Sequence, residues 1–272
     1  MTGSRQLMIN ASLTDSVAVD LDTHKEIPNG RLRFGWCPLC LIEDRAGGAD
    51  HHYLRLVWSI ATTTLCPVHG RPLMEQCHNC YRFAGTPDYA LYGKQMTLIC
   101  PVCFTPLDGR LGYDGVSDRQ AIEWNDDSQL GRVWQTLRRY EQYCQSILKL
   151  RSTRSKKKDI VVEILALLNL LTCAEEPNHL RPMDMLESAY FPAHLKLGYR
   201  THHLKRSFRA CHLVERRKAL AILICLLENS FAAFGFEPCR RPMQEFRQLM
   251  SGASYDQFER HFLNIARFAL PM

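Results

Sequence analysis

The sequence predicts an α+β protein in which a small cysteine-rich module is followed by an all-α C-terminal domain. Seven of the twelve cysteines fall between Cys37 and Cys103. The second half shows apolar residues at helical spacing and no long stretch with strand periodicity. A stretch rich in Gly and Asp separates the two parts and is typical of a linker. The predicted organisation is an N-terminal extension (1–32), the cysteine-rich module (33–107), a linker (108–117) and a helical domain with basic stretches (118–272).

Eight candidate metal ligands form four pairs, and two residues separate the members of each pair. In chain order the four knuckles are Cys37 and Cys40, Cys66 and His69, Cys77 and Cys80, and Cys100 and Cys103. Two such knuckles facing each other make the tetrahedral site of sulfur and nitrogen ligands that zinc prefers. The third and fourth knuckles are nineteen residues apart, which is within the range of known zinc sites. We therefore expect two structural Zn²⁺ ions in a zinc-ribbon or treble-clef-like double zinc module.

The pairing of the knuckles stays open at this point. Sequential pairing joins the first to the second knuckle and the third to the fourth. Cross-brace pairing joins the first to the third and the second to the fourth. A spacer of seven residues, 70–76, separates the middle knuckles and permits both arrangements, of which we favour the sequential one. We expect three further histidines to be surface residues or neighbours of ligands: His51, His52 and His78.

The segments between the knuckles predict one helix and one strand. Apolar residues in 52–65 recur at spacings of three and four, which predicts a helix that delivers Cys66. Residues 91–99 predict a strand leading into the fourth knuckle. We expect Tyr53 and Trp58 in a small core, and Arg55 in an ion pair with Glu43 or Asp44.

The order of these motifs resembles the TniQ family, which includes the TnsD-type target selectors of bacterial transposons. The resemblance covers about residues 33–107 and rests on CPLCLIED (37–44), YLRLVW (53–58), CPVHGRPL (66–73), CHNC (77–80) and CPVC (100–103). Family members usually carry a helical segment with an E-S-L-x-S-W-L-like motif before the first knuckle. Here 36 residues without that motif precede Cys37, so we expect a truncated or late-starting member.

The resemblance implies a non-enzymatic DNA-targeting adaptor that selects a transposon's insertion site. The expected partners are DNA, an AAA+ ATPase transposition regulator and, as in some relatives, an RNA-guided complex; a homodimer stays open. Two alternatives remain: a RING-like module of ubiquitin-ligase type, which needs cross-brace pairing, and a zinc-ribbon transcription regulator. The chain has no H-E-x-x-H or Walker lysine motif, so we do not expect an enzyme.

The charge distribution indicates an anionic partner of the second half. The chain carries a net charge of +6, and residues 111–272 hold all of the excess. Two basic stretches, 138–158 and 196–218, are candidates for nucleic-acid contact, and the second has the pattern of a helix-turn-helix. A solvated helix face or a surface for an acidic protein is the alternative. The candidate contact residues are Arg154, Lys156, Lys157, Lys158, Arg200, Lys205, Arg206 and Arg209.

The remaining helices and the compartment follow from hydrophobic patterning. We expect helices over 118–150, 159–172, 183–190, 204–217, 218–234, 241–250 and 255–268. The chain has neither an apolar run long enough for a membrane span nor a secretion signal, so we expect a cytoplasmic protein without membrane contact.

Overall fold

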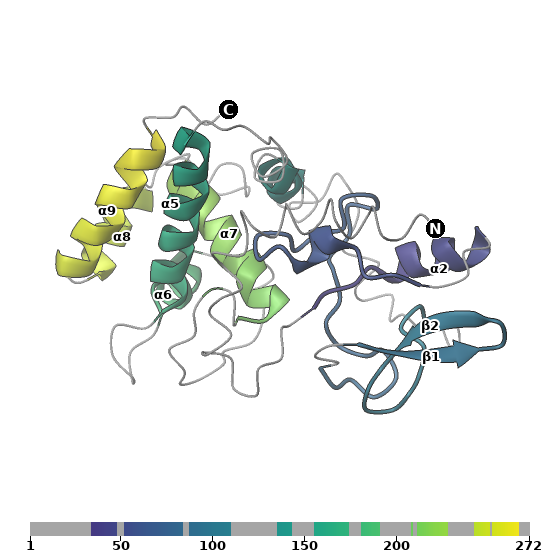
Figure 1. The fold of residues 1–272 in the computed structure, drawn as a ribbon. Coiled ribbons are helices and arrows are strands. Elements are labelled where there is room, and N and C mark those ends of the chain that lie inside the picture. The colour runs from purple at the N-terminus through teal and green to yellow at the C-terminus, as the bar shows by residue number, and fades with distance from the viewer. Residues whose placement is uncertain are drawn as a thin grey trace. The chain divides into compact units, whose positions relative to one another are not determined.

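The computed structural model describes residues 34–47, 52–83, 87–109, 135–142, 155–173, 181–190, 208, 211–227, 242–250 and 252–266. The chain divides into two compact units, Met1–Trp124 and Asn125–Met272. The first unit combines helix with a small two-stranded sheet, and the described elements of the second unit are helices (Figure 1). None of the helices in the described ranges is long and apolar enough to cross a membrane.

Helix α2 (Pro38–Ala46) begins inside the first knuckle. Cys37 is its N-cap residue with extended backbone, and Pro38 occupies the first helical position, where its missing N–H costs nothing. The helix ends at Gly47, whose N–H donates to the Glu43 carbonyl at 2.8 Å. The first knuckle is therefore the start of a helix, and its two cysteines lie one turn apart on one face.

Strands β1 (Asp88–Tyr92) and β2 (Gln95–Ile99) form an antiparallel hairpin. The two residues between them begin with Gly93, whose φ of 66° a glycine adopts without steric cost. Thr97, Leu98 and Ile99 are buried, whereas β1 is largely exposed. The predicted strand over 91–99 is thus partly right, because β2 leads into the fourth knuckle but a turn interrupts the range.

The predicted helix over 52–65 is wrong. The segment contains a single 3₁₀ turn, η1 (Leu56–Ser59), with extended backbone on both sides. Three consecutive threonines, 62–64, weaken helix formation. The segment instead pairs with the chain after the second knuckle, where the Leu73 N–H donates to the Thr64 carbonyl at 2.9 Å.

Arg55 makes the predicted ion pair, and its partner is Asp44. The two guanidinium nitrogens donate to the two carboxylate oxygens at 2.8 and 3.2 Å. The guanidinium carbon also lies 4.7 Å from the ring centroid of Tyr53 and 4.9 Å from that of Trp58. Trp58 is buried as expected, but Tyr53 is exposed, so its assignment to the core is wrong.

The second unit contains helices α5 (Ser155–Thr172), α6 (Pro182–Tyr190), α7 (Leu213–Leu227), α8 (Pro242–Leu249) and α9 (Gly252–Ala266). A further helical stretch spans 135–142. Most of these match predicted helices within a few residues. The predicted break between 217 and 218 is wrong, because α7 runs through it without interruption.

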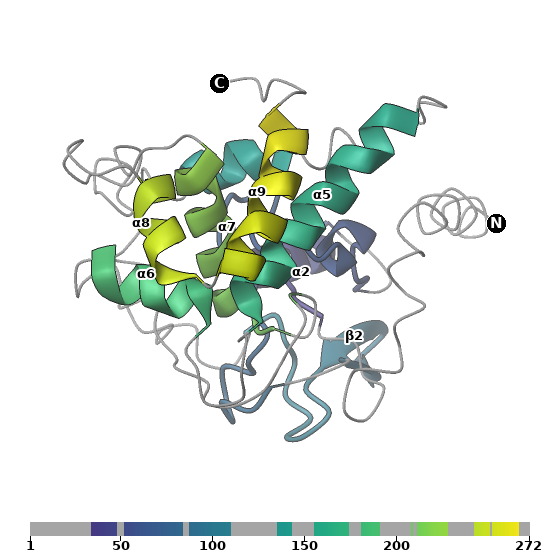
Figure 2. The ribbon, with the colours of Figure 1, turned by 90° about the vertical axis from the view of Figure 1, so that its left-hand side faces the viewer.

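Helix α5 packs against α9, α7 and α6 (Figures 1 and 2). Glu163 of α5 bonds His261 of α9 and accepts from Asn264 Nδ2 at 3.0 Å, which fixes this pair of helices. Between α8 and α9, the Phe246 and Phe258 rings meet edge to face with centroids 4.5 Å apart. Helix α7 is buried over almost its whole length, and its residues from 219 to 227 are all apolar, as expected for a buried helix.

A buried ionic network ties α6 to the start of α7. Arg181 donates to Glu215 at 2.6 Å and to both oxygens of Asp184, and Lys218 donates to Asp184 at 2.9 Å. Glu215 also accepts from the backbone N–H of His212 at 2.8 Å, as the third residue of a helix does in a capping box. Burial lowers the pKa of Arg181, but its two carboxylate partners raise it by more, so the guanidinium stays charged.

Replacing Glu215 by alanine is expected to destabilise the second unit strongly. The change removes the buried carboxylate to which Arg181 Nη1 and the His212 N–H donate, and breaking a buried pair costs about 3–5 kcal/mol. Urea denaturation followed by circular dichroism measures the loss. Asp256→Ala removes an exposed carboxylate of α9 and should change stability by at most about 0.5 kcal/mol. Equal effects of the two substitutions would contradict this account of the network.

Candidate metal centre

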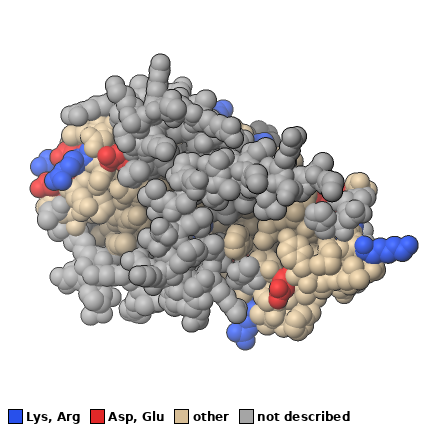
Figure 3. Space-filling view, viewed as in Figure 1, with Lys and Arg blue, Asp and Glu red and all other residues tan. Residues whose placement is uncertain are grey.

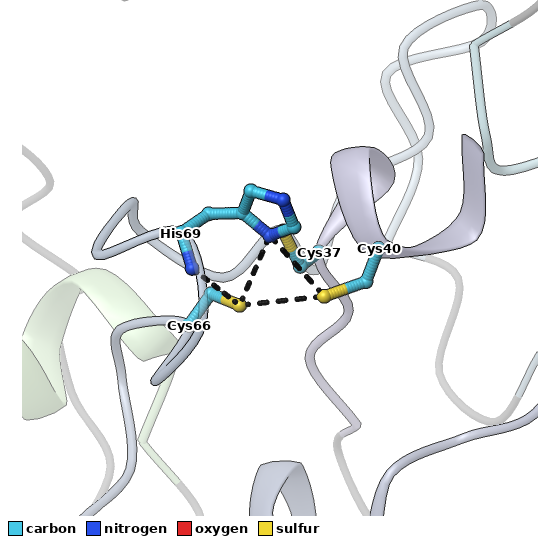
Figure 4. Close-up of side chains that lie close together, drawn as sticks. All are labelled: Cys37, Cys40, Cys66 and His69. Atoms are coloured by element: carbon cyan, nitrogen blue, oxygen red, sulfur yellow. Dashed lines mark hydrogen bonds between the residues drawn. The ribbon is translucent and has the colours of Figure 1, made fainter. Parts of the chain in front are cut away.

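The first and second knuckles meet and form the first cluster, which contains Cys37, Cys40, Cys66 and His69. Their four ligand atoms lie within 4.8 Å of one another, and His69 contributes Nδ1 (Figure 4). This nitrogen is 3.3–3.6 Å from the three sulfurs, and the Cys40 and Cys66 sulfurs are 3.5 Å apart. Tetrahedral zinc with its usual bond lengths places such atoms about 3.6–3.8 Å apart, so the donor set fits a zinc ion.

Glu43 orients the histidine of this cluster. Its Oε1 lies 2.9 Å from His69 Nε2, the ring nitrogen that faces away from the cysteines. Glu43 follows Cys40 by three residues on α2. One turn of this helix therefore carries Cys40, which belongs to the cluster, and Glu43, which contacts His69 of the same cluster. A carboxylate that accepts from Nε2–H fixes the tautomer that leaves Nδ1 free for a metal ion. The sequence pattern indicated Glu43 only as a partner for Arg55.

The third and fourth knuckles form the second cluster, which contains Cys77, Cys80, Cys100 and Cys103. The Cys77 and Cys103 sulfurs are 3.5 Å apart, and those of Cys80 and Cys100 are 3.8 Å apart. Four sulfurs at these distances match a zinc site with four cysteine ligands. The two clusters are therefore paired sequentially, and the cross-brace arrangement on which a RING-like module depends does not occur at these eight residues.

The second, third and fourth knuckles share one backbone turn. In each, the N–H of the first cysteine donates to the carbonyl five residues later, and its carbonyl accepts from the N–H four residues later, at 2.7–2.9 Å. The residue after the second ligand adopts positive φ in all three: Gly70 at 66°, Tyr81 at 56° and Phe104 at 58°. This conformation is free for glycine but costs other residues roughly 1–2 kcal/mol. The two cysteine-only knuckles thus place an aromatic residue where glycine fits best.

The thiols within each cluster differ in acidity. The neighbouring Cys37 and Cys40 thiols lower the pKa of Cys66, whereas burial raises the pKa of Cys77 to about 12. Burial also acts to raise the pKa of Cys103, but hydrogen bonds with Thr105, Cys77 and Asn79 together outweigh it and lower that pKa to about 6. Metal binding must therefore displace protons from the less acidic thiols, which makes it weaker as the pH falls.

A buried polar link joins α2 of the first cluster to the end of the fourth knuckle. Arg45 Nη2 lies 2.7 Å from an oxygen of Asp108, which is fully buried, and 3.4 Å from Thr97 Oγ1 of β2. The Leu98 N–H donates to Nδ1 of the buried His52 at 3.3 Å. The prediction that His52 lies at the surface or beside a ligand is wrong, because His52 is an internal contact of the module.

The candidate nucleic-acid contacts fall largely outside the described residues. Arg154, Arg200, Lys205, Arg206 and Arg209 lie outside them, and for Lys156, Lys157 and Lys158 the structure describes only the backbone, in α5. Of the basic stretch 196–218, the last three cations belong to α7 and are buried: Arg216, Arg217 and Lys218. Their inclusion in an exposed basic stretch is a correction to the sequence analysis.

Comparison with known protein families bears on the first cluster. The TniQ family model matches residues 20–73. The resemblance predicted from the motifs over about 33–107 is thereby confirmed for 33–73, a stretch that contains all four residues of the first cluster and ends before the second. TniQ proteins are associated with target selection in transposition. No curated protein and no solved structure matched the chain.

Replacing Glu43 by glutamine is expected to weaken metal binding at the first cluster. An amide holds the His69 ring less firmly, and loss of such a partner typically lowers metal affinity 10- to 100-fold; the exposure of Glu43 favours the lower end. Competition with a zinc chelator measures the change. Asp88→Asn, at an exposed position of β1, is the control and should leave affinity unchanged. An unaltered affinity in the Glu43 variant would show that the contact does not support the ligand.

Proposed function

We propose that the protein is a non-enzymatic DNA-targeting adaptor in transposition, which selects a target site and recruits an AAA+ ATPase regulator. The observation that carries this proposal is the TniQ match over residues 20–73, centred on a cluster with complete metal-ligand geometry. Both clusters offer four protein donors, so a bound ion would have no open position for water or substrate. The metal would then shape a recognition surface and take no part in chemistry.

We propose that each cluster holds one structural Zn²⁺ ion. Small modules with little apolar core depend on such ions for their stability. Native mass spectrometry should therefore detect about two zinc ions per chain. The variant C37S/C40S should retain one ion and C77S/C80S the other, because the clusters share no ligand. A wild-type value of zero or one would contradict the two-site proposal.

We assign DNA contact to the basic stretches of the helical half. Neutralising phosphates with Lys and Arg supplies affinity that does not depend on sequence, and residues 111–272 carry the whole excess of positive charge. On the face drawn in Figure 3, the described Lys and Arg side chains are scattered and form no continuous basic surface. We place the contact at Arg154–Lys158 and Arg200–Arg209 from the sequence pattern; their side chains lie outside those that the structure describes.

Replacing Lys205, Arg206 and Arg209 together by glutamine is expected to weaken DNA binding. Each lost phosphate contact should reduce the slope of log affinity against log salt by about one, so the triple variant should lose about three. Fluorescence anisotropy over a salt series measures both quantities, and Arg260→Gln, at an exposed position of α9, is the control. An unchanged slope would assign this stretch to a protein partner.

Recruitment is tested with the AAA+ ATPase encoded beside a transposase gene in the same genome. Immobilised target DNA should retain the ATPase only when this protein is present, and the triple variant should reduce that retention. The absence of such neighbouring genes, or retention that does not depend on this protein, would overturn the adaptor proposal.

A further inference from the structure

Exposed aromatic side chains lie next to the knuckles of the second cluster in the sequence. Among the described residues, ten of the eleven large apolar side chains that are exposed lie between Tyr53 and Phe104. Tyr81 and Phe104 are 76% and 66% exposed, although each directly follows a cysteine of the cluster. Large exposed rings directly beside the ligands of a small module call for an explanation beyond packing.

Backbone strain at Tyr81 and Phe104 is a second, independent indication that these residues have a role other than packing. The second knuckle makes the same turn with Gly70 at the left-handed position, so the turn itself does not need a side chain there. Tyr81 and Phe104 adopt an unfavourable positive φ. Because their rings are exposed, burial contributes little free energy to offset this strain. Strain that packing does not offset is characteristic of residues held for binding.

The two rings are attached to the same cluster. The four sulfurs of the second cluster lie within 4.8 Å of one another, and each ring follows a knuckle that supplies two of them. The knuckles also touch directly, because Asn79 Nδ2 donates to Thr105 Oγ1 at 3.0 Å. Asn79 is two residues before Tyr81, and Thr105 follows Phe104. The backbone at both rings is therefore fixed by one cluster and one shared hydrogen bond.

The charges around this surface favour an anionic ligand. Among the described residues between the second and fourth knuckles, the exposed cations are Arg71, Arg82 and Lys94, whereas Asp88 is the exposed anion. Arg82 stands between the exposed rings of Tyr81 and Phe83. Flat apolar faces interleaved with cations match the bases and phosphates of a nucleic acid strand.

We propose that the second cluster carries a binding surface for single-stranded nucleic acid, on which unpaired bases stack against Tyr81 and Phe104 while Arg82 contacts phosphate. Bases within a duplex are stacked on each other, so exposed rings on two short turns suit a strand whose bases are free. The site goes beyond the proposed adaptor function. It lies outside the matched range, which ends at residue 73, and it is separate from the basic stretches of the helical half.

The test compares the wild-type protein with the variant Y81G/F104G. Glycine suits the left-handed backbone, so the zinc content and the unfolding midpoint should be retained while both rings are lost. Binding is measured by fluorescence anisotropy with oligonucleotides of about 12 units, a length within known single-strand site sizes: oligo-dT, oligo-rU, an abasic strand with the same number of phosphates, and a duplex.

The wild-type protein should bind oligo-dT or oligo-rU more tightly than the abasic strand. The variant should lose at least about 10-fold of that affinity, since each stacked ring contributes roughly 5- to 100-fold. Duplex and abasic binding should not change. The ratio of oligo-dT to oligo-rU affinity identifies DNA or RNA as the source of the strand. A second variant, Y81N/F104N, tests the same loss with another residue type that tolerates positive φ. Leu263→Ala removes an exposed apolar side chain of α9 and is the control.

Two results would overturn the proposal. Equal affinity for the abasic strand and oligo-dT would show that binding is electrostatic alone. Failure to bind any single strand, with both variants otherwise like wild type, would assign the aromatic surface to a protein partner. In that case, duplex binding that depends on Lys205, Arg206 and Arg209 would still support the adaptor function, so the two proposals can fail separately.

Discussion

Three or four thiolates cannot share a space of a few ångströms without a cation among them. Both clusters gather their ligand atoms within 4.8 Å, and this requirement acts on the described part of the first unit at two places. A chain segment with one short helix, one 3₁₀ turn and one hairpin has little apolar surface to bury. The folded structure of this segment must therefore depend on its metal-ligand clusters. The backbone turns of the knuckles bring the ligands of each cluster together.

In the repeated knuckle turn, the backbone that holds the ligands does not depend on which side chain follows the second ligand. Its backbone hydrogen bonds are the same in three knuckles whether the following residue is glycine or aromatic. Side chains at that position therefore vary without altering the ligand geometry. The first knuckle departs from this plan, because Cys37 and Cys40 begin a helix, and that helix brings Glu43 to His69.

The sequence predicts the knuckles well because ligand spacing is a local property. Two-residue spacing, together with the lengths between knuckles, was enough to expect the two groups of four that the structure brings together. The helix over 52–65 failed for the opposite reason. Its apolar spacing satisfied a helical pattern, but pairing of Thr64 with Leu73, a contact that no local pattern encodes, holds the backbone extended.

Charge was equally hard to interpret from sequence. Arg216, Arg217 and Lys218 belong to a basic stretch, yet α7 buries them, and Lys218 is held by Asp184, 34 residues earlier. The Arg45–Asp108 pair likewise joins residues that are far apart in the sequence, and no sequence motif predicts it. Contacts of this kind depend on how elements pack, so a run of basic residues indicates solvent exposure only where no acidic partner is buried beside it.

The Arg45–Asp108 pair has a consequence for the energetics of the first unit. Helix α2 is held at its start by two cysteines of the first cluster and near its end by a carboxylate that follows the second. An ion bound at one cluster would order α2, and α2 would in turn order the segment that carries ligands of the other. Two bound ions would then share a coupling free energy, and such a linkage is reciprocal. Occupation of either cluster would raise the affinity of its neighbour although they have no ligand in common.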